Sequence, residues 1–491
     1  MTWSDLFGNW PLIVPEICLF GLALTVLAID AFTDRRESKH GMAYLASFGA
    51  AAVLVVLAAR RGHMGEAFGG MFVVDASAIL FKALFLIAAF LTGLGSIHFA
   101  VRQTRYPGEY YGLLLLSTLG LMIMVSAGDL MTLYLGVELG TASLYALAAF
   151  RKHRLRSSEA GLKYVLLGAI SSGVLIYGIS LIYGAAGTTK LTAVAAMLDG
   201  FYSVSPLSVI GLVMVVAGLS FKCVAAPFHM WAPDVYEGAP TPITGFLSVA
   251  SKAAGFAVLL RVLGAGVGDQ SLGLAALSST WQPLVIALAA ISMILGNLVA
   301  LQQRNIKRML AYSGIAQAGY LLVAVAADSP RGSASVVAYL FLYTFTNLGA
   351  FLTAAAVRGN VGDYEIPSYR ALSRRAPLLS LGLLILLLSL AGIPPLAGFV
   401  GKFHLFWSAV EQPGLWWLVL LGALMSVVSL YYYLMVIRQM YLLEDAPDRS
   451  PLVINPPLAL AIVICVVATI VIGVWPAPLF GFVASAVSPV P

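Results

Sequence analysis

The sequence predicts an all-α membrane protein that crosses the bilayer many times. Of its 491 residues, 60% are hydrophobic and only 10% are charged, and the mean hydropathy is +0.93. Soluble domains carry about 25% charged residues. A membrane-spanning helix needs about 20 apolar residues, and fourteen such stretches follow one another along the chain. We therefore expect ~14 transmembrane helices and no sizeable aqueous domain.

The expected helices are joined by short loops, and their order suggests an internal duplication. They cover residues 11–32, 41–60, 75–99, 109–127, 129–150, 158–186, 207–227, 240–266, 281–303, 305–326, 333–358, 376–411, 414–442 and 452–475. We divide them into three N-terminal helices in 1–100, two five-helix units in 109–266 and 281–442, and a C-terminal helix in 451–491. An odd number of spans makes the two five-helix units inverted repeats, an arrangement typical of transporters.

Two stretches interrupted by proline organise the expected fold. Residues 220–243 read SFKCVAAPFHMWAPDVYEGAPTPI, and residues 391–407 read AGIPPLAGFVGKFHLFW. Hydrocarbon cannot replace the backbone hydrogen bonds that proline removes from a helix. Such breaks persist only where they are buried in protein or line a wet cavity. We therefore expect discontinuous helices around an internal polar axis.

The loops carry their basic residues with a strong asymmetry. Of the 28 lysine and arginine residues, eighteen fall in loops on one side, and only Arg60, Arg61, Lys190 and Arg331 fall in loops on the other. The side rich in lysine and arginine faces the cytoplasm. This predicts that both termini lie outside the cytoplasm, which in a bacterial plasma membrane is the periplasm. Because the basic residues sit between apolar segments, they indicate topology and no nucleic-acid partner.

Five charged residues within or beside the expected helices are the candidates for chemistry: Glu138, Lys163, Lys222, Lys252 and Lys402. A charge near the bilayer centre costs about 2.5–3.5 kcal/mol on insertion scales. A bundle that needed only packing would use leucine instead. Desolvation allows a lysine to cycle between charged and neutral forms, and a nearby carboxylate controls that exchange. We predict a horizontal proton relay; the alternative is that Glu138 forms a static ion pair with Lys163 or Lys222.

Other polar residues in the expected helices have less certain roles. Lys82 and Arg261 lie nearer helix ends, from which either could snorkel, and we treat both as structural. His229 and His404 stand beside the two breaks, either in the relay or hydrogen-bonded to the backbone. Inward-facing polar side chains are expected to order water between the lysines, namely Ser313, Gln317, Thr344, Thr346 and Asn347.

Motifs for redox chemistry and nucleotide hydrolysis are absent from the sequence. It has no Gly-rich dinucleotide or phosphate loop, no CxxC pair and no clustered histidines. Its three cysteines lie apart in apolar runs. We expect no cofactor and no metal in this chain, so the driving force for any uphill transport must come from an ion gradient or an attached partner.

Six stretches resemble one known family. They are PEICLFGLALTVLAID (15–30), GVELGTASLYALAAF (136–150), EAGLKYVLLGAISSG (159–173), FKCVAAPFHMWAPDVYEGAPTPITGFLSVASKAAGF (221–256), NIKRMLAYSGIAQAGY (305–320) and LSLAGIPPLAGFVGKFHLFWSAV (388–410). The sequence is similar here to the antiporter-like subunits of NADH–quinone oxidoreductase, respiratory complex I. The likeness is greatest to the subunit N branch, the counterpart of mitochondrial subunit 2.

The resemblance implies a fold, a function and a set of partners. It implies fourteen helices with two inverted five-helix repeats. Glu138, Lys222, Lys252 and Lys402 would be the proton-channel residues, with Lys163 beside them. Quinone reduction in other subunits, which would hold the flavin, iron–sulfur clusters and quinone, would drive translocation. The expected partners are the other membrane subunits, including sister antiporter-like subunits, and the lipid bilayer. The alternative is a subunit of a multi-subunit Na+/H+ antiporter or of a membrane-bound hydrogenase.

Overall fold

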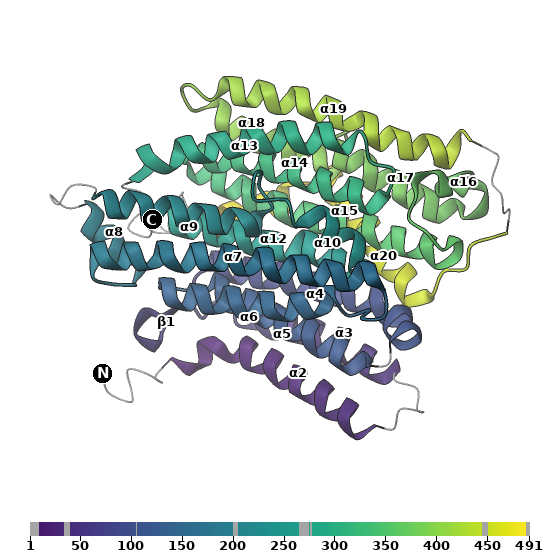
Figure 1. Cartoon of the computed structure of the whole chain (residues 1–491), viewed down its shortest axis with the longest axis horizontal. Coiled ribbons are helices and arrows are strands. Elements are labelled where there is room, and N and C mark those ends of the chain that lie inside the picture. Colours follow the sequence, from purple (N-terminus) through teal and green to yellow (C-terminus); the bar gives the residue numbers. More distant parts are fainter. Residues whose placement is uncertain are drawn as a thin grey trace.

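A computed structural model describes residues 9–33, 40–104, 106–199, 205–264, 274, 277–443 and 450–487. Long helices run side by side along a common direction and form one bundle (Figure 1). Thirteen helical segments among the described residues are long and apolar enough to span a membrane. They are Trp10–Phe32 (ending in α2, Val14–Phe32), α3 (His40–Ala59), α4 (Ala76–Gln103), α5 (Pro107–Val125), α6 (Leu130–Ala148), α7 (Leu155–Ala186), α9 (Pro206–Cys223), Thr241–Leu263, α13 (Ser278–Ala300), α14 (Ile306–Ala326), α15 (Pro330–Val361), α19 (Trp416–Tyr441) and α20 (Pro456–Val474).

The fourteenth expected span is the long stretch broken by proline, and it consists of two short helices. They are α17 (Pro377–Ala391) and α18 (Ala397–Val410). Each of the fourteen predicted stretches thus corresponds to a helix or a broken helix, which confirms the all-α membrane fold. The grouping of the chain into units and the inverted relation between the two five-helix units stay predictions.

Both predicted breaks are present. Helix α9 ends at Cys223, Val224 adopts a left-handed conformation with φ 59°, and the chain becomes helical again at α10 (Ala232–Gly238). Helix α17 ends at Ala391, and Gly392 follows with φ 92°. The span Thr241–Leu263 is also irregular, because a π-helical stretch, Leu247–Ser251, separates α11 (Thr241–Phe246) from α12 (Lys252–Leu263). Such π-helical turns are frequent at functional sites.

The sequence did not predict several short elements. A small antiparallel hairpin pairs β1 (Gly65–Ala67) with β2 (Phe72–Val74), and short helices form at α8 (Leu191–Asp199), α16 (Leu372–Arg375) and α21 (Ala477–Val487). Strands of three residues are too short to show the alternation that identifies a strand. Helix α21 has 11 residues, too few to span a bilayer.

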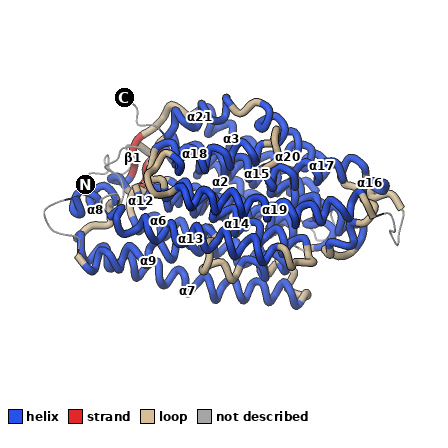
Figure 2. The backbone as a smooth tube through the Cα atoms, turned by 90° about the horizontal axis from the view of Figure 1, so that it is seen from above, coloured by secondary structure: helices blue, strands red, loops and turns tan. Residues whose placement is uncertain are grey.

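Burial divides the helices into a central group and an outer group. The most hydropathic windows of Thr241–Leu263, α14 and α15 are 100%, 94% and 89% buried, whereas those of α7 and α19 are each 28% buried. Figure 1 shows α2 and α19 at opposite edges, and Figure 2 shows α7 along one face with α14 and α15 inside. A helix that is apolar all round belongs in a core, so polar residues on the central helices require a special reason.

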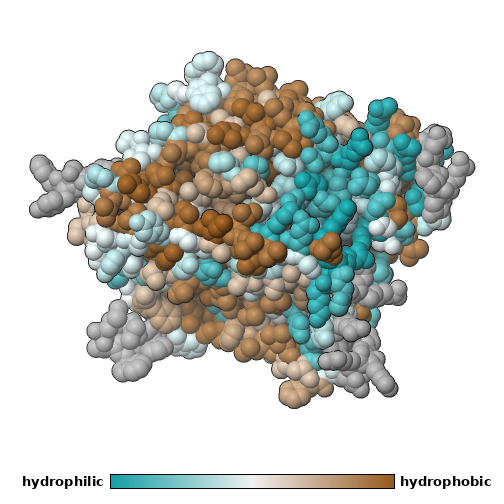
Figure 3. All heavy atoms as spheres, viewed as in Figure 1, coloured by the Kyte–Doolittle hydropathy of each residue, from teal (hydrophilic) through white to brown (hydrophobic). Residues whose placement is uncertain are grey.

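The two ends of the bundle differ in character. Hydrophilic residues gather at the end near α16, beside a broad hydrophobic surface (Figure 3). The described chain begins and ends at the opposite end, near β1 and α8 (Figures 1 and 2). This agrees with an even number of crossings, whereas the periplasmic location of that end stays a prediction.

Candidate functional site: a file of buried lysines

Lys222, in the last turn of α9, is 6% exposed and donates a hydrogen bond to the Thr141 hydroxyl on α6. Glu138 lies one turn before Thr141 and accepts a hydrogen bond from Ser172 on α7. The Glu138 carboxylate on α6 and the Lys222 ammonium on α9 therefore lie beside the same turn of α6, near enough to interact electrostatically. Among the described residues, however, the carboxylate forms no ion pair with either predicted lysine. The static ion pair weighed above as the alternative is absent here.

Lys252 begins α12 directly after the π-helical stretch and is fully buried. Its ammonium donates to the Gly314 carbonyl oxygen at 2.7 Å and to the Tyr343 hydroxyl at 3.3 Å, and it lies 4.8 Å from the centre of the Tyr343 ring. One turn further on, Gly255 packs against the end of α9. A Cβ at Gly255 would lie 3.0 Å from Cys223 N, so a glycine here lets α12 approach the helix that carries Lys222.

Lys402, on α18, is 4% exposed. Its ammonium donates to the Ala391 carbonyl oxygen at 3.1 Å and to Ser426 Oγ at 2.9 Å. In a continuous helix the Ala391 carbonyl would accept from the N–H four residues later, but that residue is Pro395, which has none. The proline break therefore creates the backbone acceptor that Lys402 uses.

A second carbonyl freed by the same break connects this site to Lys252. The Leu390 carbonyl loses its helical donor to Pro394 and accepts from Gln317 Nε2 at 3.2 Å. Gln317 Oε1 in turn accepts from the Tyr339 hydroxyl at 2.5 Å. The Tyr339 ring stacks on the Tyr343 ring with 6.2 Å between centroids. Polar groups thus lead from Lys252 to the second break, where Lys402 binds the next carbonyl.

The three lysines share an electrostatic property. Within the described residues, no carboxylate lies in ion-pair contact with Lys222, Lys252 or Lys402, although ion pairs form elsewhere. Burying a charged group without a counter-ion is costly. Each of these ammonium groups therefore keeps its proton at a free-energy cost, which is the condition under which a lysine exchanges it.

Lys222, Lys252 and Lys402 are called the lysine file below, and Lys163 is not part of it. Lys163 is 40% exposed and pairs with Glu159 at 2.7 Å and with Asp234 at 2.6 Å. Arg308 also contacts Asp234, at 2.7 Å, and Glu237, at 3.0 Å. Burial opposes ionisation of Asp234, but hydrogen bonds from Lys163 and Arg308 outweigh it and hold the pKa of that carboxyl below its usual range. Lys163 thus belongs to a charged cluster that ties α7 and α14 to α10.

The remaining predicted relay residues have different positions. His404 Nδ1 is 2.9 Å from the Val400 carbonyl oxygen, and its ring stacks 4.0 Å from Phe480. This favours the backbone-bonded role for His404. Thr344 donates to the Leu340 carbonyl of its own helix, and the described residues give it no other partner. Ser313 bonds to the Tyr433 hydroxyl, one turn from Gln317. His229 is buried beside the first break, and its Nδ1 has no described hydrogen-bond partner.

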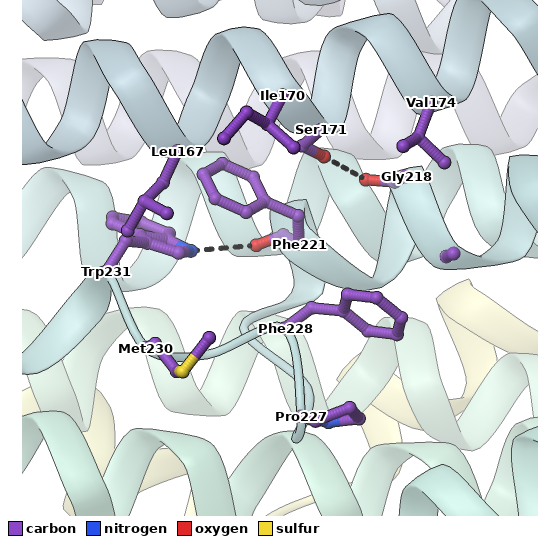
Figure 4. Close-up of a pocket in the computed structure, with 11 residues that line it drawn as sticks. Leu167, Ile170, Ser171, Val174, Gly218, Phe221, Pro227, Phe228, Met230 and Trp231 are labelled. Carbon is purple, nitrogen blue, oxygen red and sulfur yellow. Dashed lines mark hydrogen bonds between the residues drawn. The ribbon is translucent and has the colours of Figure 1, made fainter.

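The first break does not open a polar passage to the surface on the α7 side. A hollow of about 170 Å³ lies there, between α7, α9 and the loop that follows α9 (Figure 4). Its walls are mainly apolar, with Leu167, Phe221 and Met230 among them, and the Trp231 indole closes one side through a 3.2 Å bond to the Phe221 carbonyl. A relay through this region must run on the inner side, toward α6 and α12.

Sequence reasoning missed several buried polar residues. Lys307, placed in a loop, is fully buried and donates to the carbonyls of Glu237 and Ala239 at 3.0 and 2.7 Å. The tyrosines at 339 and 343 carried no distinguishing signal, since buried tyrosines are common in a bundle. Thr141 had one signal, its spacing of three residues from Glu138, which places both on one helical face.

Neither Lys82 nor Arg261, which we treat as structural, snorkels to the membrane surface. Lys82 is fully buried and pairs with Glu16 at 2.8 Å, across α4 and α2. Arg261 is 8% exposed and pairs with Asp75, the N-cap residue of α4. Partners distant in the sequence satisfy both cations inside the protein, so neither needs to reach the membrane surface.

The bundle, its two broken helices and the buried lysines define an antiporter-like membrane protein. Residues 127–429 match the family model described as NADH:quinone oxidoreductase/Mrp antiporter, TM, and the chain belongs to this family. It is 46% identical to NADH-quinone oxidoreductase subunit N of Moorella thermoacetica, an alignment that covers 97% of this chain and 98% of that one.

Two solved structures are similar over almost the whole chain. A chain of respiratory complex I from Thermus thermophilus is 32% identical with a TM-score of 0.79, covering 97% of this chain and 99% of that one. A chain of the membrane-bound sulfane sulfur reductase, an archaeal respiratory membrane complex, is 26% identical with a TM-score of 0.85, covering 97% and 98%. These likenesses extend beyond the matched domain to the N-terminal helices.

Proposed function

We propose that this chain is a proton-translocating membrane subunit of an NADH–quinone oxidoreductase. The observation that carries the proposal is a set of three buried lysines for which the described residues provide no carboxylate counter-ion. Tyrosine, glutamine and proline-freed carbonyls lie between two of them, Lys252 and Lys402. Inserting three charged side chains into a membrane costs free energy, and packing alone does not require them. The relatives that bear the subunit N name match over nearly the full chain, which supports this particular complex.

In this proposal the proton moves between lysines in short steps. Lys252 exchanges its proton with the Tyr343 hydroxyl, 3.3 Å away. The Tyr339 hydroxyl, oriented by Gln317, takes part next, and bridging water passes the proton on to Lys402 beside the second break. The Gln317 amide and the backbone carbonyls orient these groups and do not themselves carry the proton. No direct hydrogen bond joins the Tyr343 and Tyr339 hydroxyls among the described contacts, so we infer a bridging water at that step. Glu138 acts as the charge that biases Lys222.

The energy source lies outside this chain in our proposal. We propose that partner subunits hold the flavin, iron–sulfur clusters and quinone, and that sister antiporter-like subunits lie beside this one. We further propose a bacterial inner membrane with both termini in the periplasm, because the basic loops then face the cytoplasm.

A second candidate is a subunit of a sodium/proton antiporter or a hydrogenase-like complex. The description of the matching family model, which names the Mrp antiporter beside NADH:quinone oxidoreductase, favours it. The subunit N relatives, 46% and 47% identical over nearly the full chain, favour the first candidate. Lysines also suit protons better than Na+, which prefers oxygen ligands.

Gentle purification of the tagged chain from its own membranes tests the proposal. We expect flavin, iron–sulfur signals and NADH–quinone reductase activity to co-purify. Isolation with only other hydrophobic antiporter chains, together with sodium/proton exchange in vesicles, would instead establish the second candidate.

A further inference from the structure

Lys307 is a buried lysine that lies outside the lysine file. It is in the first turn of α14, is fully buried, and donates to the carbonyl oxygens of Glu237 at 3.0 Å and Ala239 at 2.7 Å. Its ammonium also lies 4.9 Å from the centre of the Tyr364 ring. Lys252 has partners of the same two kinds, a carbonyl oxygen and an aromatic ring. Lys307 thus has the chemical surroundings of a lysine in the file.

The charge of Lys307 is not compensated by a carboxylate. Among the described residues it forms no ion pair, and the nearby Glu237 carboxylate is instead bound at 3.0 Å to two arginines, one on α7 and one on α14. Arg151 and Arg358 lie near enough to repel the Lys307 ammonium. The first turn of a helix is also unfavourable for a cation. Burying a charge in these surroundings costs free energy, which is the condition under which a lysine exchanges its proton.

A charged cavity connects the backbone that holds Lys307 to the hydrophilic end. The cavity measures about 170 Å³ and is lined by residues of α7, α10 and α14, among them the exposed Arg156 and Glu159. Glu237 and Gly238 also line it. Lys307 binds the carbonyl of Glu237 and that of the residue after Gly238. Water that enters this cavity therefore reaches the last turn of α10, to which the ammonium is bound.

Buried hydroxyl groups lead from Lys307 toward Lys252. The Tyr364 hydroxyl, on the ring beside Lys307, bonds to a threonine hydroxyl at the start of α11. Buried hydroxyl side chains continue from there at intervals of three and four residues, and Lys252 comes four residues after the last. We call these side chains the hydroxyl stripe: Thr241, Thr244 and Ser248. Side chains at this spacing lie on one side of a helix, so the stripe ends at the turn that carries Lys252.

Two polar atoms beside the hydroxyl stripe have no described partner. Asn347 donates to Ser248 Oγ at 2.8 Å, and its own Oδ1 is buried without a described acceptor contact. The Tyr236 carbonyl accepts from Thr244 at 3.0 Å, and the Tyr236 hydroxyl is also buried without a described partner. Buried polar groups are bonded to protein or to ordered water. These two atoms therefore indicate where water joins the stripe.

The separation of the two lysines is short enough for such a connection. Lys307 and Gly314 lie seven residues apart on α14, and the Gly314 carbonyl accepts from Lys252. Seven residues of an α-helix rise by about 10 Å. About three or four hydrogen bonds of about 2.8 Å each cover that distance.

We propose that Lys307 loads the lysine file, taking up a proton at the hydrophilic end and passing it through water and the hydroxyl stripe to Lys252. One proton leaves the Lys307 ammonium and binds the neutral Lys252 amine, and water in the charged cavity then protonates Lys307 again. This inference rests on the proposed function and adds the residue at which protons enter. In the proposed orientation the hydrophilic end faces the cytoplasm, from which a proton pump must take its protons.

Replacing Lys307 by arginine separates proton exchange from a positioning role. Arginine keeps the charge and can donate to both carbonyls, but it is not deprotonated in proteins. Pumping by the purified complex in proteoliposomes, expressed per assembled complex, should therefore fall by about tenfold or more in Lys307→Arg. Lys82→Arg is the matched control, because Lys82 is also fully buried but is paired with Glu16, and its pumping should be unchanged. Normal pumping in Lys307→Arg would overturn the proposal.

A histidine at the same position distinguishes lost exchange from a disturbed fold. Lys307→His restores a side chain that exchanges protons near its ordinary pKa of about 6.5. We expect pumping above that of Lys307→Arg, with an optimum at lower pH than in the wild type. Equal losses in Lys307→His and Lys307→Arg at every pH would show that the lysine only positions α10, which overturns the proposal.

The route is tested without changing Lys307. Thr244→Val removes a hydroxyl from the middle of the stripe at nearly constant shape and should reduce pumping severalfold. Thr353→Val is its control, because Thr353 is equally buried on α15 and donates to the Gly349 carbonyl of its own helix. Equal pumping in the two variants would overturn the stripe as the route.

Lys252→Met, measured in the same preparation, separates this inference from the proposed function. Loss of pumping in Lys252→Met but not in Lys307→Arg would overturn only the loading role. Normal pumping in both variants would overturn the proposed function as well.

Discussion

Gln317 and Tyr339 connect the two innermost lysines of the file. The Tyr339 hydroxyl on α15 donates to Gln317 Oε1 on α14 at 2.5 Å, and the other end of the same amide donates to the Leu390 carbonyl oxygen at the second break. Lys402 binds the carbonyl of the next residue. The Gln317 side chain therefore links α14, α15 and α17. Its amide oxygen accepts one hydrogen bond and its NH2 group donates another.

Removing the Tyr339 hydroxyl should interrupt this connection. Tyr339→Phe leaves Gln317 Oε1 without its donor, and we expect proton pumping coupled to NADH oxidation to fall by about tenfold or more, since a positioned proton-transfer group contributes about 10²–10⁴-fold. Assembly should survive, because the ring still packs. Proton uptake and quinone reductase activity in proteoliposomes measure the effect. Tyr369→Phe is the control, since Tyr369 is also fully buried and its hydroxyl has no described partner; equal pumping in both variants would contradict the expectation.

Proton translocation should be as sensitive to changes at Lys222, the first lysine of the file. Lys222→Ala removes the ammonium bound to Thr141, and Glu138→Ala removes the charge beside it. We expect each change to lower proton translocation and, through coupling, NADH–quinone turnover, while the complex still assembles. The control is Lys190→Ala, which removes an exposed lysine directly before α8 and should leave both rates unchanged. Normal pumping by an assembled Lys222→Ala complex would show that this charge is structural.

Proton pumping should also depend on the space around the Lys252 ammonium. A Cβ at Gly314 would lie 3.0 Å from Lys252 Nζ and 3.2 Å from the Tyr343 hydroxyl. Gly314→Ala should therefore displace the ammonium from its carbonyl acceptor and reduce pumping severalfold. Gly359→Ala, in the last turns of α15 with nothing near its Cβ, should be neutral or slightly stabilising because alanine favours a helix by about 1 kcal/mol over glycine. Retained pumping in Gly314→Ala would mean that the ammonium does not need this acceptor.

The sequence predicts the helices and the breaks well because both depend on local composition. Apolar length identifies a span, and Pro394 and Pro395 have to leave two carbonyls without helical donors. Which donors fill those positions depends on helices that are distant in the sequence, so the pairings with Gln317 and Lys402 could not be predicted. The same limit applies to Lys82, whose partner Glu16 lies on another helix.

Depth in the membrane was also hard to predict from sequence for residues near helix ends. Lys307 follows the loop before α14 and resembles a topology signal, yet α10 and Tyr364 cover it completely. Lys163, within the predicted span but near its start, lies in the partly exposed cluster around Asp234. A helix that extends beyond the bilayer, such as α7 with 32 residues, makes sequence position a poor measure of depth.

The cluster around Asp234 should stabilise α10 in a pH-dependent way. The pKa of Asp234 is held below its usual range in the folded protein, so its contribution is present above the unfolded pKa of about 3.9 and is lost as the pH falls through the lower folded value. Asp234→Asn should therefore destabilise the protein at neutral pH, by no more than about 1 kcal/mol because the pair is partly exposed. Thermal unfolding at several pH values measures this: the difference from wild type should shrink below about pH 4. A difference that stays constant through that range would contradict the assignment.

Lys82 and Lys252 offer a final contrast between a structural and a functional buried lysine. Lys82 is paired with Glu16, so Lys82→Met leaves a buried carboxylate unpaired and should destabilise the protein by about 3–5 kcal/mol. Adding Glu16→Gln should recover most of that loss, because no buried charge then remains. Lys252→Met should cost little stability, because the partners of its ammonium among the described residues are a carbonyl and a hydroxyl and include no carboxylate, yet it should abolish pumping. Thermal unfolding of the three variants, together with proton uptake by the assembled complex, separates the two roles. Equal destabilisation by Lys82→Met and Lys252→Met would mean that both lysines hold the bundle together.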